Sequence, residues 1–262
     1  MSYTRTNLDG SALTFPQDAK IHFEEEGHIY TVDGLGQMTP VSTVVSSFFK
    51  KFDADYWSLR KCDGDRQKAA LLREQWNCKG HIAAQLGTHL HKQIENYLNK
   101  QAAPQLQCHL QYHGQHVQEE RVCDISHEWK MFMNFHHAAT YQPFRTEWAV
   151  YDVEARMSGT IDLLCSRPDG TYEIFDWKRS NKINPTEHNR WDSGLKGLEH
   201  LTDTSYMHYC LQQNLYRYML EKNYGLRVSA MHLVVLHPDY SNYRIVDVPR
   251  MEREVGIMLR NK

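Results

Sequence analysis

The chain has 262 residues, of which 41% are hydrophobic and 24% charged. This composition is ordinary for a folded protein with a substantial core. No apolar run approaches the roughly 18 residues of a transmembrane helix, and the polar N-terminus lacks the apolar core of a secretory signal. We therefore expect no membrane partner and a cytoplasmic location, with a nucleoid-associated or organellar one left open. A formal net charge of −2 gives no global signature of nucleic-acid binding, so such a role would need a local basic patch.

The first half of the chain is predicted to be mainly helical. Residues 1–20 look like a loosely ordered lead-in, and residues 21–32 have the pattern of a β-hairpin. Helices are expected over residues 41–49 and through most of 53–100, with an interruption at Gly80. The polar, histidine-rich stretch 101–118 predicts an exposed loop, and a further helix is expected over 119–139.

The second half predicts a sheet with one strong helix. Three strands in a meander are expected over residues 144–153, 157–164 and 172–178, after Pro143 ends the preceding helix. A polar loop (181–204) leads to a helix over 206–222 that Gly225 closes. Two more strands (228–236 and 243–248) and a short helix from Arg250 follow. No composition shift marks a linker, so one α/β domain with a helical N-terminal embellishment fits this order.

The second and third strands of this meander carry Asp162, Asp176 and Lys178. The turn signal Pro-Asp-Gly at 168–170 predicts that they pair as a hairpin, and side-chain alternation puts Asp176 and Lys178 on one face. Charges embedded in apolar strands are costly unless they serve a purpose. A catalytic metal site would give all three residues a role. The carboxylates would hold a divalent cation beside a water nucleophile, and the lysine would offset negative charge. The alternative is a surface hairpin with a salt-bridged lysine.

Two predicted helices carry further candidates. His91 and Glu95 are four residues apart, beside a stripe of Leu90, Ile94 and Leu98, so the imidazole is either a metal ligand or a core histidine. Gln212 and Tyr216 are also four apart and present an amide and a phenol on one face. Alternatively, Tyr216 is core and Gln212 is a solvated neighbour.

Two clusters of polar residues are less informative. A basic run is either a phosphate-binding patch or a solvated loop; it comprises Lys178, Arg179, Lys182, Arg190 and Lys196. The histidine-rich stretch contains zinc-type ligands, but their spacing matches no structural zinc pattern, so zinc is not expected; these are Cys108, His109, His113 and His116.

The joint order of the motifs resembles the RecB-type exonuclease branch of the PD-(D/E)XK nuclease superfamily, over about residues 80–222. The motifs are Gly87-Thr88-x-x-His91-x-x-x-Glu95, Gly159-x-x-Asp162, Asp176-x-Lys178 and Gln212-x-x-x-Tyr216. An upstream segment with His28-x-Tyr30, the run 41–45 and Phe52-Asp53 is similar to the lead-in of single-domain relatives of the mitochondrial genome maintenance exonuclease.

This resemblance implies a restriction-endonuclease-like mixed central β-sheet flanked by helices, with Mg²⁺ or Mn²⁺ in its cleft. The implied metal ligands are His91, Asp162, Asp176 and the main-chain carbonyl of Trp177. Lys178 would serve the attacking water, and the substrate-binding residues would be Gln212, Tyr216 and Arg179. Glu95 would support the ligands, and Glu147 would support them or hold a second metal. Some relatives carry an iron–sulfur cluster bound by four cysteines; because only Cys210 follows Lys178, no such cluster is expected.

The sequence thus predicts a metal-dependent DNA nuclease, an exonuclease acting on ends or single-stranded DNA in repair or recombination. Residues 21–262 would form a single nuclease domain, with a helical part over about 40–140 and a catalytic core over about 141–250. Without a phosphate-binding Walker motif, a helicase or replication partner would be a separate polypeptide. Two alternatives are a site-specific endonuclease and a catalytically silent nucleic-acid-binding protein of the same fold. The sequence contains no pattern that indicates the cleavage polarity, the choice between DNA and RNA, or the oligomeric state.

Overall fold

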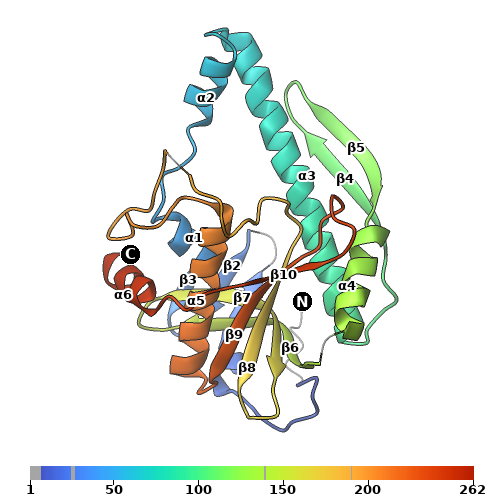
Figure 1. Ribbon diagram of the computed structural model, residues 1–262, viewed down its shortest axis with the longest axis vertical. Helices are drawn as coiled ribbons and strands as arrows, with labels where there is room; N and C mark the ends of the chain where they lie inside the picture. The colour runs from blue at the N-terminus through green and yellow to red at the C-terminus, as the bar shows by residue number, and fades with distance from the viewer. Residues whose placement is uncertain (1–6, 25–26, 139, 190) are drawn as a thin grey trace. The chain divides into compact units, whose positions relative to one another are not determined.

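The computed structural model describes residues 7–24, 27–138, 140–189 and 191–262 (Figure 1). The chain divides into two compact units. Unit 1 comprises Met1–Lys50, Ala138–Val235 and Arg244–Lys262, and unit 2 comprises Lys51–His137 and Leu236–Tyr243. Over the described ranges, no helix combines the length and the apolar character needed to cross a bilayer.

Within its described residues, unit 1 contains a mixed sheet of eight strands in the order β1-β2-β3-β7-β8-β9-β10, with β6 paired to β7. The strands are β1 (Ile21–Glu24), β2 (Ile29–Val32), β3 (Gly36–Pro40), β6 (Gln142–Asp152), β7 (Met157–Ser166), β8 (Tyr172–Lys178), β9 (Val228–Val235) and β10 (Arg244–Asp247). The β3–β7 and β8–β9 pairs are parallel and the other pairs antiparallel. The predicted N-terminal hairpin, meander and last two strands are therefore confirmed.

The helices of unit 1 flank this sheet, as the predicted fold class requires. They are the 3₁₀ helix η1 (Pro16–Ala19), α1 (Val41–Ser46), α5 (Ser205–Asn223) and α6 (Glu252–Asn261). Figure 1 shows α5 along one face of the sheet. The Thr204 side chain caps its first turn by accepting a hydrogen bond from the Met207 N–H, and Gly225 follows the helix at φ +67°. The predicted helices are confirmed here, although α1 ends three residues before the predicted position 49.

Strand β7 is paired unevenly along its two edges, and this creates room for a site. One edge is paired with β6 along its length, from Met157 to Ser166. The other edge pairs with β3 only at Met157 and Ser158, and with β8 only from Leu163 onward. The four residues between, 159–162, therefore meet no strand on that edge within the described residues, and side chains from other elements can reach them.

A buried ion pair attaches the N-terminal segment to β6. Arg145, only 2% exposed, donates from Nε to Asn7 Oδ1 at 2.7 Å and from Nη1 to Asp18 Oδ2 at 2.6 Å. The other Asp18 oxygen accepts a hydrogen bond from Trp148 Nε1 at 2.9 Å. The guanidinium also lies 4.4 Å from the Trp148 ring centre and 4.8 Å from that of Phe15, so its charge is compensated on several sides.

Unit 2 is built on one long helix. Its helices are α2 (Ala54–Lys61), α3 (Arg66–Leu98) and α4 (Ser126–Ala138). The predicted interruption at Gly80 is wrong, because α3 continues through it. Gly80 lies on the exposed side of a helix whose opposite stripe is buried, including Ile82, Leu90 and Ile94. The packing of that stripe outweighs the cost of one glycine, about 1 kcal/mol.

The predicted histidine-rich loop is also wrong. Residues 107–113 and 118–124 form an antiparallel hairpin of β4 (Gln107–His113) and β5 (Gln118–Asp124). The helix predicted from residue 119 consequently begins only at Ser126. Cys108 and Leu110 are buried while His109 is exposed, which is the alternation of a half-buried strand. Cys108 and His109 thus project from opposite faces of β4 and do not converge on a common ligand.

Candidate active site

Asp162 is held at the point where β7 and β8 separate. The last Cα pair of the hairpin is Leu163 with Phe175. Beyond it, the Trp177 N–H donates to Asp162 Oδ2 at 2.8 Å, so a carboxylate replaces a strand carbonyl as its acceptor. Asp162 is 8% exposed and Asp176 2% exposed. The predicted hairpin thus brings two nearly buried carboxylate residues to one end of the strand pair.

Asp176 is held from two sides. Gln213, fully buried on α5, donates from Nε2 to Asp176 Oδ1 at 2.7 Å. The Lys178 ammonium forms an ion pair with the other Asp176 oxygen, and its side chain is only 14% exposed. Lys178 Nζ also lies 4.4 Å from the centre of the Tyr209 ring. The lysine is therefore fixed between an acid and an aromatic face.

The environment of Lys178 keeps it protonated. Burial lowers its pKa, but the neighbouring Asp176 and Asp162 carboxylates outweigh burial and raise the pKa above its ordinary value. At neutral pH the side chain is therefore an ammonium, which can donate hydrogen bonds and offset negative charge. It does not act as a general base in this state.

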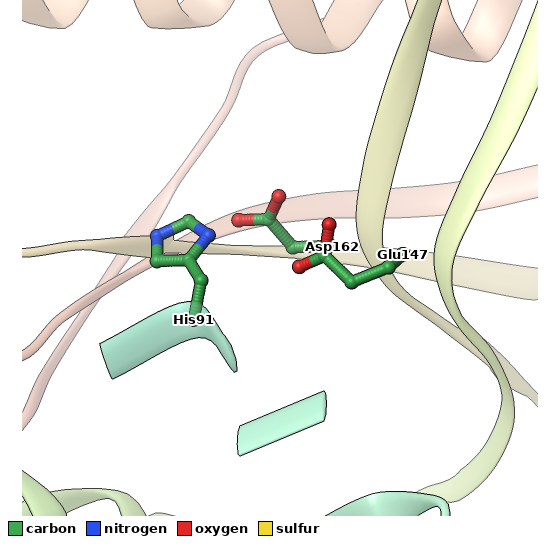
Figure 2. A group of neighbouring side chains, drawn as sticks. All are labelled: His91, Glu147 and Asp162. Carbon is green, nitrogen blue, oxygen red and sulfur yellow. The ribbon is translucent and has the colours of Figure 1, made fainter. Parts of the chain in front are cut away.

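Glu147 of β6 lies opposite Asp162 of β7. The flanking Cα pairs are Thr146 with Leu163 and Trp148 with Ile161. One carboxylate oxygen of Glu147 lies within 4.8 Å of one of Asp162 (Figure 2). Glu147 has φ +47°, a left-handed conformation that side chains other than glycine rarely adopt. Like charges directly opposite each other destabilise a sheet, whereas oxygen donors of this kind suit a hard divalent cation. The carboxylates of Glu147 and Asp162 therefore fit the divalent cation that the sequence resemblance implies.

Tyr216 packs against β7 at Gly159. A Cβ atom at position 159 would lie 2.7 Å from Tyr216 Cε1, so only glycine leaves room for the ring. Gln212 Nε2 donates to the Tyr216 hydroxyl at 3.0 Å. Burial raises the pKa of Tyr216 well above its ordinary value, with Tyr30 and Asp176 adding to the increase. The phenol is therefore neutral, and its contact with Gly159 brings the Gly159-x-x-Asp162 and Gln212-x-x-x-Tyr216 motifs together.

Tyr30 of β2 contributes a second buried hydroxyl near the acidic pair. Its oxygen lies 2.9 Å from Thr160 Oγ1, on the strand segment that carries Asp162. Burial raises the pKa of Tyr30; the hydrogen bond with Thr160 opposes this increase, and the Glu147 and Asp162 carboxylates add to it. The neutral phenol thus lies in the negative field of these two acids.

The remaining predicted residues occupy other elements. His91 and Glu95 lie on α3 of unit 2, both partly exposed beside buried Leu90 and Ile94, and Glu95 pairs with Lys92 at 2.6 Å. Arg179, partly exposed, directly follows β8.

The residues of the basic run have different surroundings. Lys178 belongs to the acidic site, because it pairs with Asp176. Lys182 and Lys196 are exposed on the loop before α5, and Arg190 lies outside the described residues. Lys196 Nζ lies 5.1 Å from the ring centre of Phe48.

Sequence reasoning missed Gln213 and Tyr209, which contact Asp176 and Lys178 respectively. The available signal was the pair Gln212-Gln213 on a helix with an aromatic residue one turn before it. Adjacent helical residues point about 100° apart, so the sequence could not tell which glutamine faces the sheet.

A mixed sheet flanked by helices, with Asp-x-Lys on one strand and a second aspartate on its hairpin partner, is a restriction-endonuclease-like arrangement. The chain belongs to the PD-(D/E)XK nuclease superfamily, whose family model matches residues 48–254. Nucleases of this superfamily typically use divalent metal ions. No curated protein matches the chain. Among solved structures, one described as "Crystal structure of SSO0001" matches with 13% identity and a TM-score of 0.32, covering 84% of this chain and 71% of that chain.

Proposed function

We propose that this protein is a Mg²⁺- or Mn²⁺-dependent deoxyribonuclease of the RecB-type branch. It would act as an exonuclease on DNA ends or single strands. One observation carries the proposal: Asp162 and Asp176 are nearly buried at one end of the β7–β8 hairpin, with the Lys178 ammonium paired to Asp176. Membership of the nuclease superfamily supports the reaction class.

The acids of unit 1 would hold the cation. Asp162 and Asp176, with the main-chain carbonyl of Trp177, are the proposed ligands. Glu147, which has a carboxylate oxygen within 4.8 Å of one of Asp162, would support these ligands or hold a second metal. His91 is proposed as a further ligand because of its place in the ordered motif set, with Glu95 as its neighbour. When bound, a divalent cation polarises a phosphoryl oxygen and makes water a better nucleophile at neutral pH.

The other residues would orient the substrate and stabilise charge. Lys178, held protonated by Asp176, would position the attacking water and offset the negative charge that develops on the phosphate. Gln213 would keep Asp176 in place. Gln212, Tyr216 and Arg179 are the proposed substrate-binding residues, and the Gln212–Tyr216 hydrogen bond would hold the first two in a fixed relation.

We further propose that residues 21–262 work as one nuclease domain and that any helicase or replication partner is a separate protein. Two other activities are compatible with this fold. A site-specific endonuclease would cut circular duplex DNA into discrete fragments. A catalytically silent nucleic-acid-binding protein would have no use for Asp162, Asp176 and Lys178 in this arrangement.

The activity test uses end-labelled linear and circular DNA, single- and double-stranded, with Mg²⁺, Mn²⁺ or a chelator. The proposal expects cleavage of linear substrates that requires the metal and yields short products. Metal-dependent cutting of circular duplex into discrete fragments would instead identify an endonuclease. If no DNA substrate is cleaved with either metal, the proposed function is wrong.

A further inference from the structure

A group of exposed and partly exposed aromatic and basic side chains lies on α2, on the segment just before it and on the facing part of α3 in unit 2. We call it the aromatic patch: Phe52, Tyr56, Trp57, Arg60, Lys61 and Trp76. Phe52 is 68% exposed, Tyr56 51% and Trp57 39%. Large apolar side chains gathered on a surface commonly mark a binding site, whereas single exposed ones do not. None of these residues takes part in the site described above.

The rings of the aromatic patch are packed in defined pairs. Phe52 and Trp76 lie with ring centres 5.7 Å apart and planes at 62°. Tyr56 and Trp57 lie 5.2 Å apart at 79°. Both are edge-to-face arrangements, which favour one relative orientation of the rings. The rings therefore present flat surfaces at fixed angles.

Two cations lie over these rings and form no ion pair with any described carboxylate. Arg60 Cζ lies 5.5 Å from the Trp57 ring centre, and its Nη1 donates to the Tyr56 hydroxyl at 3.0 Å. Lys61 Nζ lies 5.7 Å from the Trp76 ring centre. Lys68 of the same unit, in contrast, pairs with Asp65 at 3.2 Å. The positive charge of the aromatic patch is thus available to an anion.

The helix that carries most of the aromatic patch is fixed to α3. Arg73 of α3 pairs with Asp55 at 3.1 Å and donates to Ser58 Oγ at 2.9 Å, and Ser58 is fully buried. Asp53 caps α2 by accepting a hydrogen bond from the Tyr56 N–H at 2.9 Å. The ring surfaces are therefore held by structure before any ligand arrives.

We propose that the aromatic patch binds single-stranded DNA, with bases stacked on its rings and phosphates held by Arg60 and Lys61. Flat apolar faces interleaved with unpaired cations complement a flexible polyanion whose bases are unstacked. An apolar protein helix would cover the rings but leave both cations without anionic partners. The inference rests on the proposed function, because that function makes DNA the substrate, and it adds a second place where the strand is held.

The test measures binding of the full-length protein to a fluorescein-labelled oligothymidine by fluorescence anisotropy, in chelator so that no cleavage occurs. The double variant Phe52→Ala/Trp57→Ala should weaken binding about 10-fold or more, because two stacking surfaces are lost. Trp57→Phe retains a ring and should bind within about threefold of the wild type. Val122→Ala, an equally exposed apolar residue in the same unit, is the matched control and should not alter affinity.

Charge is tested separately with Arg60→Ala/Lys61→Ala, whose exposed side chains do not support the core. This variant should reduce the slope of log affinity against log salt concentration by about 1.4, the value for two phosphate contacts on a single strand. Lys68→Ala removes one positive charge, from a lysine that pairs with a carboxylate, and should leave the slope unchanged. If the aromatic double variant does not fold, the salt dependence of binding by the charge variant alone tests the proposal.

The inference is overturned if both patch variants bind oligothymidine within about twofold of the wild type, which is the outcome expected when the aromatic patch meets a protein or a lipid surface. Failure of the proposed function has a different signature. In that case no DNA is cleaved by the wild type, whereas the loss of binding in the patch variants persists. If the wild type cleaves DNA and the patch variants bind normally, only the inference fails.

Discussion

Gln213, and not its neighbour Gln212, donates its side-chain amide to Asp176, with 2.7 Å between Nε2 and Oδ1. Gln212 donates instead to the Tyr216 hydroxyl. The two adjacent glutamines of α5 therefore have different tasks. Gln213 orients a proposed metal ligand from a fully buried position, and Gln212 fixes the phenol that packs on β7.

Substitutions of Gln213 and Gln212 should have different kinetic effects. Gln213→Ala removes a hydrogen bond to a proposed ligand and should lower kcat or metal affinity about 10- to 100-fold. Gln212→Ala leaves Asp176 in place and should act mainly on KM for DNA. Titration of activity with Mg²⁺ and with substrate distinguishes the two effects. Equal losses of kcat and of metal affinity in the two variants would contradict the assignment.

Gly159→Ala should destabilise the fold, because the new Cβ atom would lie 2.7 Å from the Tyr216 ring. Overpacking of this kind costs about 1–3 kcal/mol. In the double variant Gly159→Ala/Tyr216→Ala the clash is absent, so the two losses should not add. Chemical denaturation of the three variants measures the coupling, expected at about 0.5–3 kcal/mol. Additive losses would show that the ring and the glycine do not meet.

Arg145→Met should destabilise unit 1 by about 3–5 kcal/mol, because it leaves the buried Asp18 carboxylate without its ion pair. Asp18 retains only the Trp148 Nε1 donor among the contacts described above. Urea denaturation gives the change in the free energy of unfolding. The double variant Arg145→Met/Asp18→Asn removes both charges and should recover part of the loss; no recovery would argue against an uncompensated charge as its cause.

The buried Asp152 carboxyl should make the stability of the protein depend on pH. Burial raises the pKa of this carboxyl, but hydrogen bonds from Asn223, the Ala155 N–H and Lys222 outweigh burial, so its pKa lies below the ordinary value. A depressed folded-state pKa stabilises the protein above the unfolded-state pKa, about 3.9, and this contribution is lost as pH falls through the folded value. Asp152→Asn should therefore cost about 1–3 kcal/mol at neutral pH.

The measurement is the free energy of unfolding of wild type and Asp152→Asn at several pH values. Their difference should be constant from pH 8 to about 5 and shrink below about 4. A difference that grows on acidification would contradict the direction of the pKa shift.

The strands of the site could be predicted from sequence because their patterns are local. β7 and β8 are short apolar runs around a Pro-Asp-Gly turn, and their pairing follows from the turn chemistry. The meander fixes which strands are neighbours, so the approach of Asp162 and Asp176 follows. The contact of Gly159 with Tyr216 is set by the packing of α5 on the sheet, and no local pattern encodes it.

The β4–β5 hairpin could not be predicted in the same way. Its second strand contains Gln118, Glu119, Glu120 and Arg121, residues that favour helix when judged alone. The pairing is decided by tertiary context: Leu110 is fully buried, and β4 contacts α3. Strand propensity depends strongly on such packing. The continuous α3 helix has the same explanation, since its buried stripe overrides Gly80.

The central claim is that Asp176, held by Gln213 and Lys178, is a catalytic metal ligand. It is tested most directly by the initial rate of Mg²⁺-dependent cleavage of a labelled single strand by Asp176→Asn. Asp152→Asn is the matched control, because Asp152 is an equally buried aspartate of unit 1 that lies outside the proposed site. The account predicts that Asp176→Asn abolishes cleavage while remaining folded and that Asp152→Asn cleaves at a rate close to that of the wild type. Undiminished cleavage by folded Asp176→Asn would contradict it.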